Sequence, residues 1–196
     1  MLTSRSQDEY VQPPIWPEQF HSVMLQNRSG SLALVDLWYD WPAQRNLNLI
    51  QNQQAGTLWD IEWGNRTSYY FDREANTCKT ITMPVGLLTP NWLSEAEYVG
   101  QQTVDNHLCN VWKKEAFIIY WADVKTGKPV KWIFEWTGAT FEILTWSEGE
   151  VLEDEQWQAP AACFSSNAAE LSGALLDDPG VSTSPLPKFG MNVAAA

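Results

Sequence analysis

The sequence has few of the residues and motifs on which the common kinds of enzyme chemistry depend. It contains only two histidines, His21 and His107, and three cysteines that lie far apart without a C-x-x-C spacing. This spacing disfavours a zinc cluster or a thioredoxin-like redox motif. The sequence also has no phosphate-binding loop, dinucleotide fingerprint, HExxH, GxSxG or EF-hand pattern. We therefore lack the usual grounds for a nucleotide enzyme, a zinc protease or an esterase, and expect no cofactor and no metal.

Positive charge is scarce as well. There are 12 Lys and Arg residues against 24 Asp and Glu, which gives a net charge of -12. Binding to nucleic acid depends on clustered Lys and Arg, so this balance argues against a nucleic-acid partner, and the same charge would be repelled by an anionic membrane surface. No apolar run approaches the roughly 18 residues of a membrane span, and we expect none.

Helical periodicity is nearly absent, and the apolar residues instead alternate with polar ones. The sequence has 12 tryptophans, and Trp59-Asp60-Ile61-Glu62-Trp63 shows the alternation most clearly. Successive side chains of a strand point to opposite faces of a sheet. Trp59, Ile61 and Trp63 are therefore predicted to share an apolar face, with Asp60 and Glu62 on a solvated outer face.

Eleven strands are predicted from this alternation and from the turn signals between its segments. Eleven strands are too many for a flat open sheet, so we expect a mainly β fold, a single curved antiparallel half-barrel whose concave side is filled by short helix or loop elements. The apolar stretch from Pro84 to Trp92 is poorly suited to a strand and is the expected filler. The predicted strands cover residues 18–26, 32–40, 46–53, 57–63, 67–73, 78–84, 97–104, 107–115, 116–123, 129–136 and 139–147.

The two ends of the chain differ in composition from the middle. Residues 1–15 are polar and contain proline, and residues 165–196 are rich in Ala, Ser, Pro and Gly without any tryptophan. Such segments bury little apolar surface, so we expect flexible ends around one domain at residues 16–164. A protein partner that binds through these ends is one further possibility.

Asp36 is the one carboxylate that interrupts an apolar run, Leu34-Val35-Asp36-Leu37-Trp38. Such a run predicts burial on both faces, and a buried carboxylate needs a partner, for which Arg45 is a candidate. The structural interpretation, a paired carboxylate that fixes the sheet, is favoured over catalysis. Both histidines are interpreted as solvated or outward-facing positions.

The large aromatic side chains indicate a binding function more than a reaction. We expect a protein that binds a lipid or another hydrophobic small molecule in the hollow and is not an enzyme. An enzyme that uses Asp36 in the same hollow, and a structural or assembly partner, are the alternatives. Alternation alone cannot show which face is concave, so the candidate wall residues come from both faces: Trp38, Trp59, Trp63, Trp112, Trp121, Trp132, Phe134 and Trp136.

Two features favour secretion over a cytoplasmic location. The residues Cys78, Cys109 and Cys163 allow one disulfide and one free thiol, although three buried reduced cysteines remain the alternative. Asn27-Arg28-Ser29 and Asn65-Arg66-Thr67 are acceptor sequences for N-glycosylation at predicted turns. The first residues, MLTSRSQDEYVQPP, lack the apolar segment of a signal peptide.

Several motifs resemble those of the ependymin-related proteins, and they resemble those of an uncharacterised plant and algal group more closely. The similar segments span roughly residues 16–164 and include Trp16-Pro17-Glu18, Val35-Asp36-Leu37-Trp38, Pro90-Asn91-Trp92, Cys109-Asn110-Val111-Trp112, Tyr120-Trp121-Ala122-Asp123 and Thr126-Gly127-Lys128-Pro129. The resemblance implies a secreted, disulfide-bonded half-barrel like that of the bacterial lipoprotein carriers of the LolA type. It also implies a hydrophobic ligand pocket, although fold kinship alone does not fix function.

Overall fold

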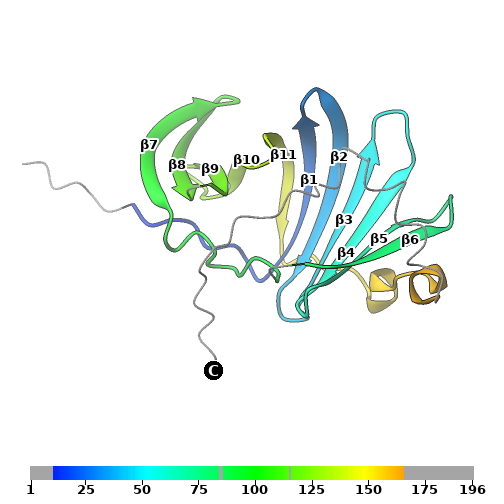
Figure 1. Ribbon diagram of the computed structural model, residues 1–196. Helices are drawn as coiled ribbons and strands as arrows, with labels where there is room; N and C mark the ends of the chain where they lie inside the picture. Colours follow the sequence, from blue (N-terminus) through cyan, green and yellow to red (C-terminus); the bar gives the residue numbers. More distant parts are fainter. Residues whose placement is uncertain (1–10, 84–85, 115, 166–196) are drawn as a thin grey trace, which may run out of the picture.

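The protein is a single, unclosed antiparallel sheet of eleven strands (Figure 1). The computed structural model describes residues 11–83, 86–114 and 116–165. The predicted fold class is confirmed, and each predicted strand is present with ends that differ by at most two residues. The strands are β1 (Gln19–Arg28), β2 (Ser31–Asp40), β3 (Arg45–Asn52), β4 (Thr57–Trp63), β5 (Thr67–Asp72), β6 (Thr77–Thr82), β7 (Glu97–Val104), β8 (His107–Lys114), β9 (Ile118–Asp123), β10 (Pro129–Phe134) and β11 (Ala139–Glu148).

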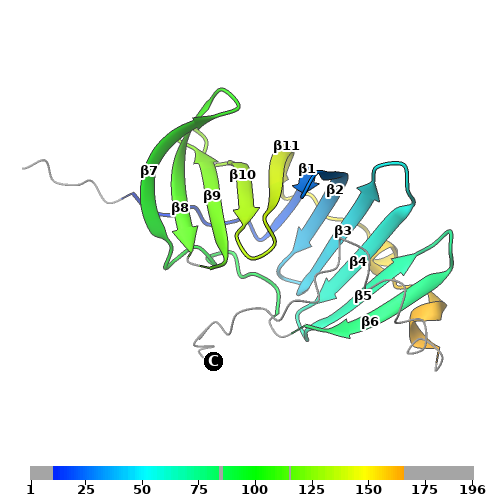
Figure 2. The same cartoon turned by 45° about the horizontal axis from the view of Figure 1, so that its top comes forward.

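The chain builds the sheet as two meanders that meet in its middle. The strand order is β6-β5-β4-β3-β2-β1-β11-β10-β9-β8-β7, so β6 and β7 are the edges although they follow one another in the sequence. The segment between them runs back along the sheet, as Figure 2 shows from a second side. The first and last strands of the domain pair with each other, from Phe20 opposite Glu148 to Asn27 opposite Thr140.

Tight turns fix the register of the hairpins. Ser29 and Gly30 both have positive φ, as do Asp105 and Asn106, which is the geometry of a two-residue hairpin turn. Asn and Asp tolerate this conformation better than other residues that carry a Cβ. Gly127, the residue type that adopts a positive φ most readily, takes a φ of 71° between β9 and β10.

The position of Trp16 identifies the concave face. Its ring centroid lies 5.7 Å from that of Tyr39 on β2 and 6.1 Å from that of Trp132 on β10, and its Nε1 donates to the hydroxyl of Tyr120 on β9 at 2.9 Å. Five adjacent strands from β2 to β9 would span roughly 19 Å in a flat sheet. The single indole of Trp16 reaches residues on strands from β2 to β9 because the sheet curves around it.

Chain segments fill the concave side, as the sequence predicted. The buried side chains of Trp92 and Leu93, from the connection between β6 and β7, pack with Trp16 and the inward-facing residues of the strands. The hydroxyl of Tyr39 donates to the carbonyl of Leu88 at 2.7 Å, and Lys114 Nζ donates to the carbonyl of Trp92 at 2.8 Å. Of the predicted filler, residues 84 and 85 lie outside the described residues.

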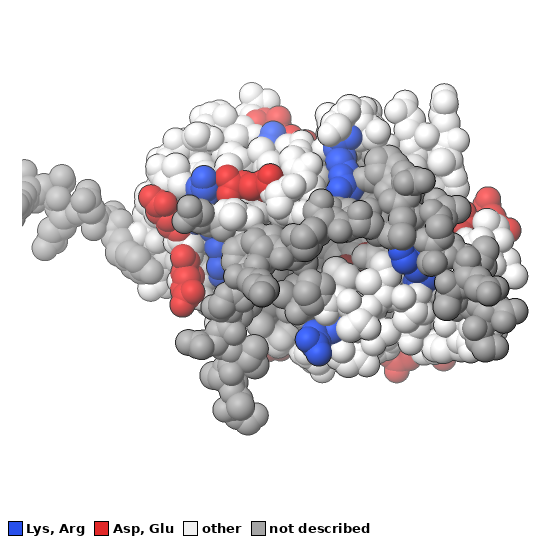
Figure 3. Space-filling model, viewed as in Figure 1, with Lys and Arg blue, Asp and Glu red and all other residues white. Residues whose placement is uncertain are grey.

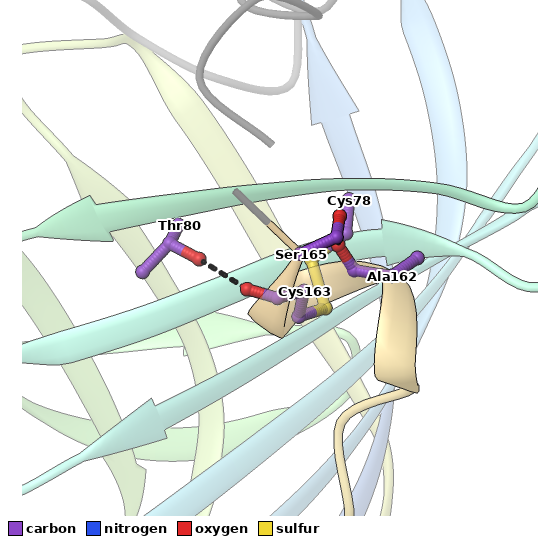
Figure 4. Close-up of a disulfide and its surroundings, with 5 residues drawn as sticks. All are labelled: Cys78, Thr80, Ala162, Cys163 and Ser165. Atoms are coloured by element: carbon purple, nitrogen blue, oxygen red, sulfur yellow. Dashed lines mark hydrogen bonds between the residues drawn. A yellow bond between two sulfur atoms is a disulfide. The ribbon is translucent and has the colours of Figure 1, made fainter. Parts of the chain in front are cut away.

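The opposite, convex face has its own cover. Leu47, Ile61 and Phe71 pack there under the segment that follows β11, which contains the short 3-10 helices η1 (Asp154–Trp157) and η2 (Ala161–Phe164). A disulfide joins Cys163 of η2 to Cys78 of β6 (Figure 4). Near it, Ser165 Oγ donates to the carbonyl of Ala162 at 3.0 Å.

No helix in the described ranges is both long and apolar enough to cross a membrane. Of the end segments that the sequence predicted to be flexible, the structure describes residues 11–15 and 165. The rest of both segments lies outside the described residues.

Candidate functional site

The sheet opens between β10 and β11. These strands pair over only four positions, from Lys131 opposite Glu142 to Phe134 opposite Ala139. Beyond Glu142, β11 pairs with β1 alone, and the pairing with β1 skips Leu144, a β-bulge between Ile143 and Thr145. A bulge bends and twists its strand, so the end of β11 diverges from β10.

A cleft of about 830 Å³ occupies this opening. The far end of β11 forms one wall, and the β7–β8 and β9–β10 turns form the other. The ring of Trp146 stacks on Phe20 at 4.1 Å, which connects the cleft to the concave aromatic layer. Its apolar lining is Leu108, Val124, Pro129, Val130, Ile143, Leu144 and Trp146, and its charged or titratable lining is Asp105, His107, Asp123, Lys125 and Lys128.

Asp123 organises the charged side of the cleft. Its Oδ1 accepts bonds from the backbone N–H groups of Lys125 and Thr126, and its Oδ2 lies 3.1 Å from His107 Nδ1. Burial acts to raise the pKa of Asp123, but the bonds from His107, Thr126 and Lys125 outweigh it and lower the pKa to about 2. Asp123 is therefore ionised at neutral pH and fixes the turn.

Three indole N–H groups on the concave side have no hydrogen-bond partner among the described residues. Trp112 and Trp132 are the cross-strand neighbours of Tyr120 on its two sides, and the ring of Trp92 lies 5.5 Å from it. The Nε1 atoms of all three are buried without a hydrogen bond. Buried indole N–H groups usually find an acceptor, so this cluster offers unused donors next to the aromatic layer.

The eight predicted wall residues are divided between the two faces. Trp112, Trp132 and Phe134 pack on the concave side. Trp38, Trp59 and Trp63 pack on the convex side under the C-terminal segment, and Trp121 packs in a separate convex cluster around Cys109. Trp136 follows the end of β10. The lining of the cleft contains none of the eight.

The predicted environment of Asp36 is wrong. Along β2 burial alternates, and Leu34 is exposed, so this run is not buried on both faces. Asp36 is 36 % exposed and is partnered by His21 Nε2 at 2.7 Å, while Arg45 pairs with Asp40 and Asp154. The His21 ring also stacks on Trp38 at 3.9 Å, and its Nδ1 lies 3.4 Å from Glu150. His21 thus faces outward on the convex side, as predicted, and its ring nitrogen is the hydrogen-bond partner of Asp36.

The solvated outer face predicted for Asp60 and Glu62 is also wrong. The two residues do lie opposite Trp59, Ile61 and Trp63, but it is the tryptophan row that faces the convex side. Asp60 is 4 % exposed, and it lies on the concave face with Glu62. The alternation was interpreted correctly, and the error came from taking the charged face to be the outer one.

The cysteines and the sequons occupy distinct positions. A disulfide is present, between Cys78 and Cys163, and Cys109 is a buried free thiol whose pKa is raised by burial. Asn65 lies at the β4–β5 turn, whereas Asn27 lies inside β1 next to its last residue, and both are exposed. Asn65 Oδ1 accepts the backbone N–H of Thr67 at 2.9 Å.

Sequence reasoning missed Trp146, Leu144 and Trp16. Trp146 sits in an ordinary alternating segment, and no local signal marks the bulge at Leu144. Trp16 stands directly before a strand and gives no sign that it enters the hollow. In the view of Figure 1, the described surface carries Lys and Arg side chains interspersed with Asp and Glu, as Figure 3 shows.

Together these features define an antiparallel β half-barrel with an internally filled hollow and a side cleft. A protein family described as a domain of unknown function (DUF8395) matches residues 15–163, and the chain belongs to this family. The comparison with curated proteins found no match.

Solved structures are similar to this chain at low sequence identity. An uncharacterized conserved protein from Thermus thermophilus aligns with a TM-score of 0.54 at 8 % identity, over 74 % of this chain and 86 % of that one. MucB aligns with a TM-score of 0.43 at 17 % identity, over 74 % of this chain and 58 % of MucB. A putative outer membrane lipoprotein-sorting protein domain from Vibrio parahaemolyticus aligns with a TM-score of 0.40 at 8 % identity, over 71 % of this chain and 89 % of that one. The first likeness shows the fold alone, and the ependymin-related assignment stays a resemblance.

Proposed function

We propose that this protein binds an amphipathic small molecule or lipid, with its apolar part in the cleft between β10 and β11. The observation that carries the proposal is the opening of the sheet at the Leu144 bulge, which exposes apolar side chains inside a cleft of about 830 Å³. Ligand pockets typically measure about 300–1,000 Å³ and combine apolar walls with a few polar groups.

The cleft provides the two kinds of surface that an amphipathic molecule needs. Leu144 is 58 % exposed and Leu108 is 48 % exposed, and both line the cleft. Completing the burial of such a half-exposed side chain against a ligand stabilises a complex by about 0.8–1.5 kcal/mol, half the value for full burial. The charged groups of the two turns lie at the other side, where a polar end of the ligand would stay hydrated.

The centre of the hollow is already filled by the protein. Trp16 and Trp92 pack against the inward-facing residues of the strands there, so the available space lies at the Trp146 end of the aromatic layer. A long apolar ligand would reach the unpartnered indole groups around Tyr120 only by displacing Trp16 or Trp92. The predicted wall residues that it would then contact are Trp112, Trp132 and Phe134.

The disulfide supports a role outside the cytoplasm. Disulfides persist in extracellular and periplasmic compartments and are rare in reducing ones. We infer such a compartment for this protein, and we infer N-glycosylation at Asn27 and Asn65 if it passes through a eukaryotic secretory pathway.

The test is binding of a fluorescent anionic naphthalene dye and a fatty acid to the purified full chain, with native mass spectrometry to detect copurifying lipid. Leu144→Ser is the test variant, and Leu34→Ser is the control because Leu34 is also exposed but lies on β2 outside the cleft. We expect Leu144→Ser to weaken binding about tenfold, the loss of one buried leucine. The proposal fails if the wild type shows no saturable binding, or if both variants bind as it does.

A further inference from the structure

The concave face of β3, β4 and β5 carries a cluster of oxygen-bearing side chains that the cleft does not include. Asn48 lies directly opposite Asp60, and Asn46 lies opposite Glu62. On the other side of β4, Asp60 lies opposite Tyr70, and Glu62 lies opposite Ser68. Directly opposed residues share a face, so these six side chains form one polar patch on an otherwise apolar layer.

Two atoms of this cluster are buried and lack a partner. Asp60 is 4 % exposed and Ser68 is 1 % exposed. Asp60 Oδ1 and Ser68 Oγ make no hydrogen bond to any residue that the structure describes. An unsatisfied buried polar atom costs about 1–3 kcal/mol, so two in one cluster call for an explanation. The Ser68 hydroxyl is the more informative of the two, because it is unused and belongs to an uncharged side chain.

The contacts that Asn48 makes in this cluster are long. Asn48 Nδ2 lies 3.4 Å from Asp60 Oδ2 and 3.4 Å from Glu62 Oε1. Lys79 lies opposite Tyr70 on the same face, yet within the described ranges no salt bridge joins a Lys or Arg to Asp60 or Glu62. Burial, followed by the charge of Glu62, raises the pKa of Asp60 well above its usual value, and burial also raises the pKa of Glu62. The buried Asp60 and the partly buried Glu62 thus lie side by side on one face of β4 with no Lys or Arg of the described residues within salt-bridge distance.

We propose that this cluster is a binding site for a calcium ion. Asp60, Glu62 and Ser68 would supply carboxylate and hydroxyl oxygens, and Asn48 would supply its amide oxygen after a rotation of the amide group. Hard divalent cations prefer such an all-oxygen set of ligands. Calcium fits better than magnesium because magnesium gives up its water reluctantly, and the burial of Asp60 and Ser68 leaves little room for water.

A bound cation accounts for each unusual feature of the cluster. The ion is coordinated by Asp60 Oδ1 and Ser68 Oγ, and its charge neutralises the carboxylates of Asp60 and Glu62. It also shortens the distances between these carboxylates and the Asn48 side chain. The site lies on β3 to β5, whereas the cleft is built from β8 to β11 and two turns. The two proposals therefore stand or fall separately.

The test uses calcium chloride alone with the full chain after removal of metal by a chelator. Isothermal titration calorimetry near neutral pH measures stoichiometry and affinity, and terbium luminescence excited through Tyr70 reports the same site. We expect one calcium ion per chain and a rise in the thermal unfolding midpoint on its addition. Asp60→Asn and Ser68→Ala are the test variants, and Glu153→Gln, an exposed acid ahead of η1, is the control.

The variants separate a cation site from a pair of acids that merely shares a proton. Asp60→Asn should abolish calcium binding, and Ser68→Ala should weaken it about tenfold through loss of one ligand. The Ser68 hydroxyl makes no hydrogen bond within the described part of the chain, so Ser68→Ala should fold as the wild type does even if Asp60→Asn does not. Glu153→Gln should bind normally. Absence of saturable binding to the wild type, or unchanged affinity in Ser68→Ala, overturns the proposal.

Discussion

The two faces of the sheet are closed in different ways. On the convex face the cover is tied down by the disulfide between Cys78 and Cys163, and Arg45 joins Asp40 to Asp154 while lying 4.4 Å from the Trp157 ring centroid. On the concave face the filler is held by ring packing and by single hydrogen bonds such as that from Trp16 to Tyr120.

The two faces of the sheet contribute differently to stability and to function. Among the described residues, five of the seven buried side-chain atoms without a hydrogen bond belong to the concave side: those of Trp92, Trp112, Trp132, Asp60 and Ser68. Unsatisfied polar atoms cost stability and therefore tend to mark places where a ligand or another function justifies them. The convex face carries the covalent tie, and the concave face together with its cleft carries the candidate sites.

The largest effect is expected from breaking the covalent tie of the convex face. The disulfide closes a loop with a sequence separation of 85 residues. Its loss in Cys78→Ser/Cys163→Ser should lower the free energy of unfolding by about 4.5 kcal/mol, by the chain-entropy estimate for a loop of this length. Urea unfolding measures the change. Cys109→Ala, at the free thiol, should cost much less, and equal losses in the two proteins would contradict the prediction.

The concave filler should respond to the loss of a single ring. Trp16 is 8 % exposed and contacts residues of five strands, so Trp16→Ala should cost about 3–5 kcal/mol, the range for large aromatic side chains in a core. If the hollow accepts ligands, the variant should also bind the naphthalene dye more strongly than the wild type.

The control for Trp16→Ala is Trp38→Ala, which removes a partly buried indole from the convex side. It should cost less and leave dye binding unchanged. A stronger effect of Trp38→Ala on both quantities would show that the convex layer, and not the hollow, is the centre of the fold.

Much of this fold could be predicted from the sequence, because strand alternation and turn residues are local signals. Asp105-Asn106 and Gly127 took the conformations that their residue types favour. Which face is concave could not be predicted, because curvature depends on pairings such as β1 with β11 that join distant residues. Asp60 was therefore placed on the wrong surface, and the opening at Leu144 depends on a bulge that no residue type specifies.

The pH dependence of stability tests the acidic cluster of the concave face. Folding raises the pKa of Asp60 above 3.8, so the folded protein keeps this proton to a higher pH than the unfolded chain does. The contribution to stability is full below the unfolded pKa and is lost as the pH rises through the folded pKa. The loss is about 1.4 kcal/mol for each unit between the two pKa values.

Urea unfolding between pH 4 and pH 8 with a chelator present measures this slope. Asp60→Asn removes the titrating group, so its unfolding free energy should decline less over the same range. Calcium should reverse the decline of the wild type if the cluster binds it. A wild-type protein whose stability rises steadily over this range, with the same slope in Asp60→Asn, would show that the pair does not hold an extra proton.

The smallest effect is expected from a convex contact that acts through one charge. The guanidinium of Arg73 lies 4.2 Å from the ring centroid of Trp59 and 5.3 Å from that of Phe71, and Arg73 is exposed. At an exposed site such a cation–π contact is worth about 0.5–1 kcal/mol, so Arg73→Gln should lower the free energy of unfolding by that amount. Arg66→Gln is the matched control, since Arg66 is exposed in the neighbouring turn, and it should change the free energy of unfolding little.

Equal changes in both variants would mean that loss of positive charge from a strongly acidic protein, and not the ring contact, accounts for the result. A clear difference would show that the convex face is stabilised by many small contacts in addition to its disulfide, which leaves the concave face free to keep its unsatisfied groups.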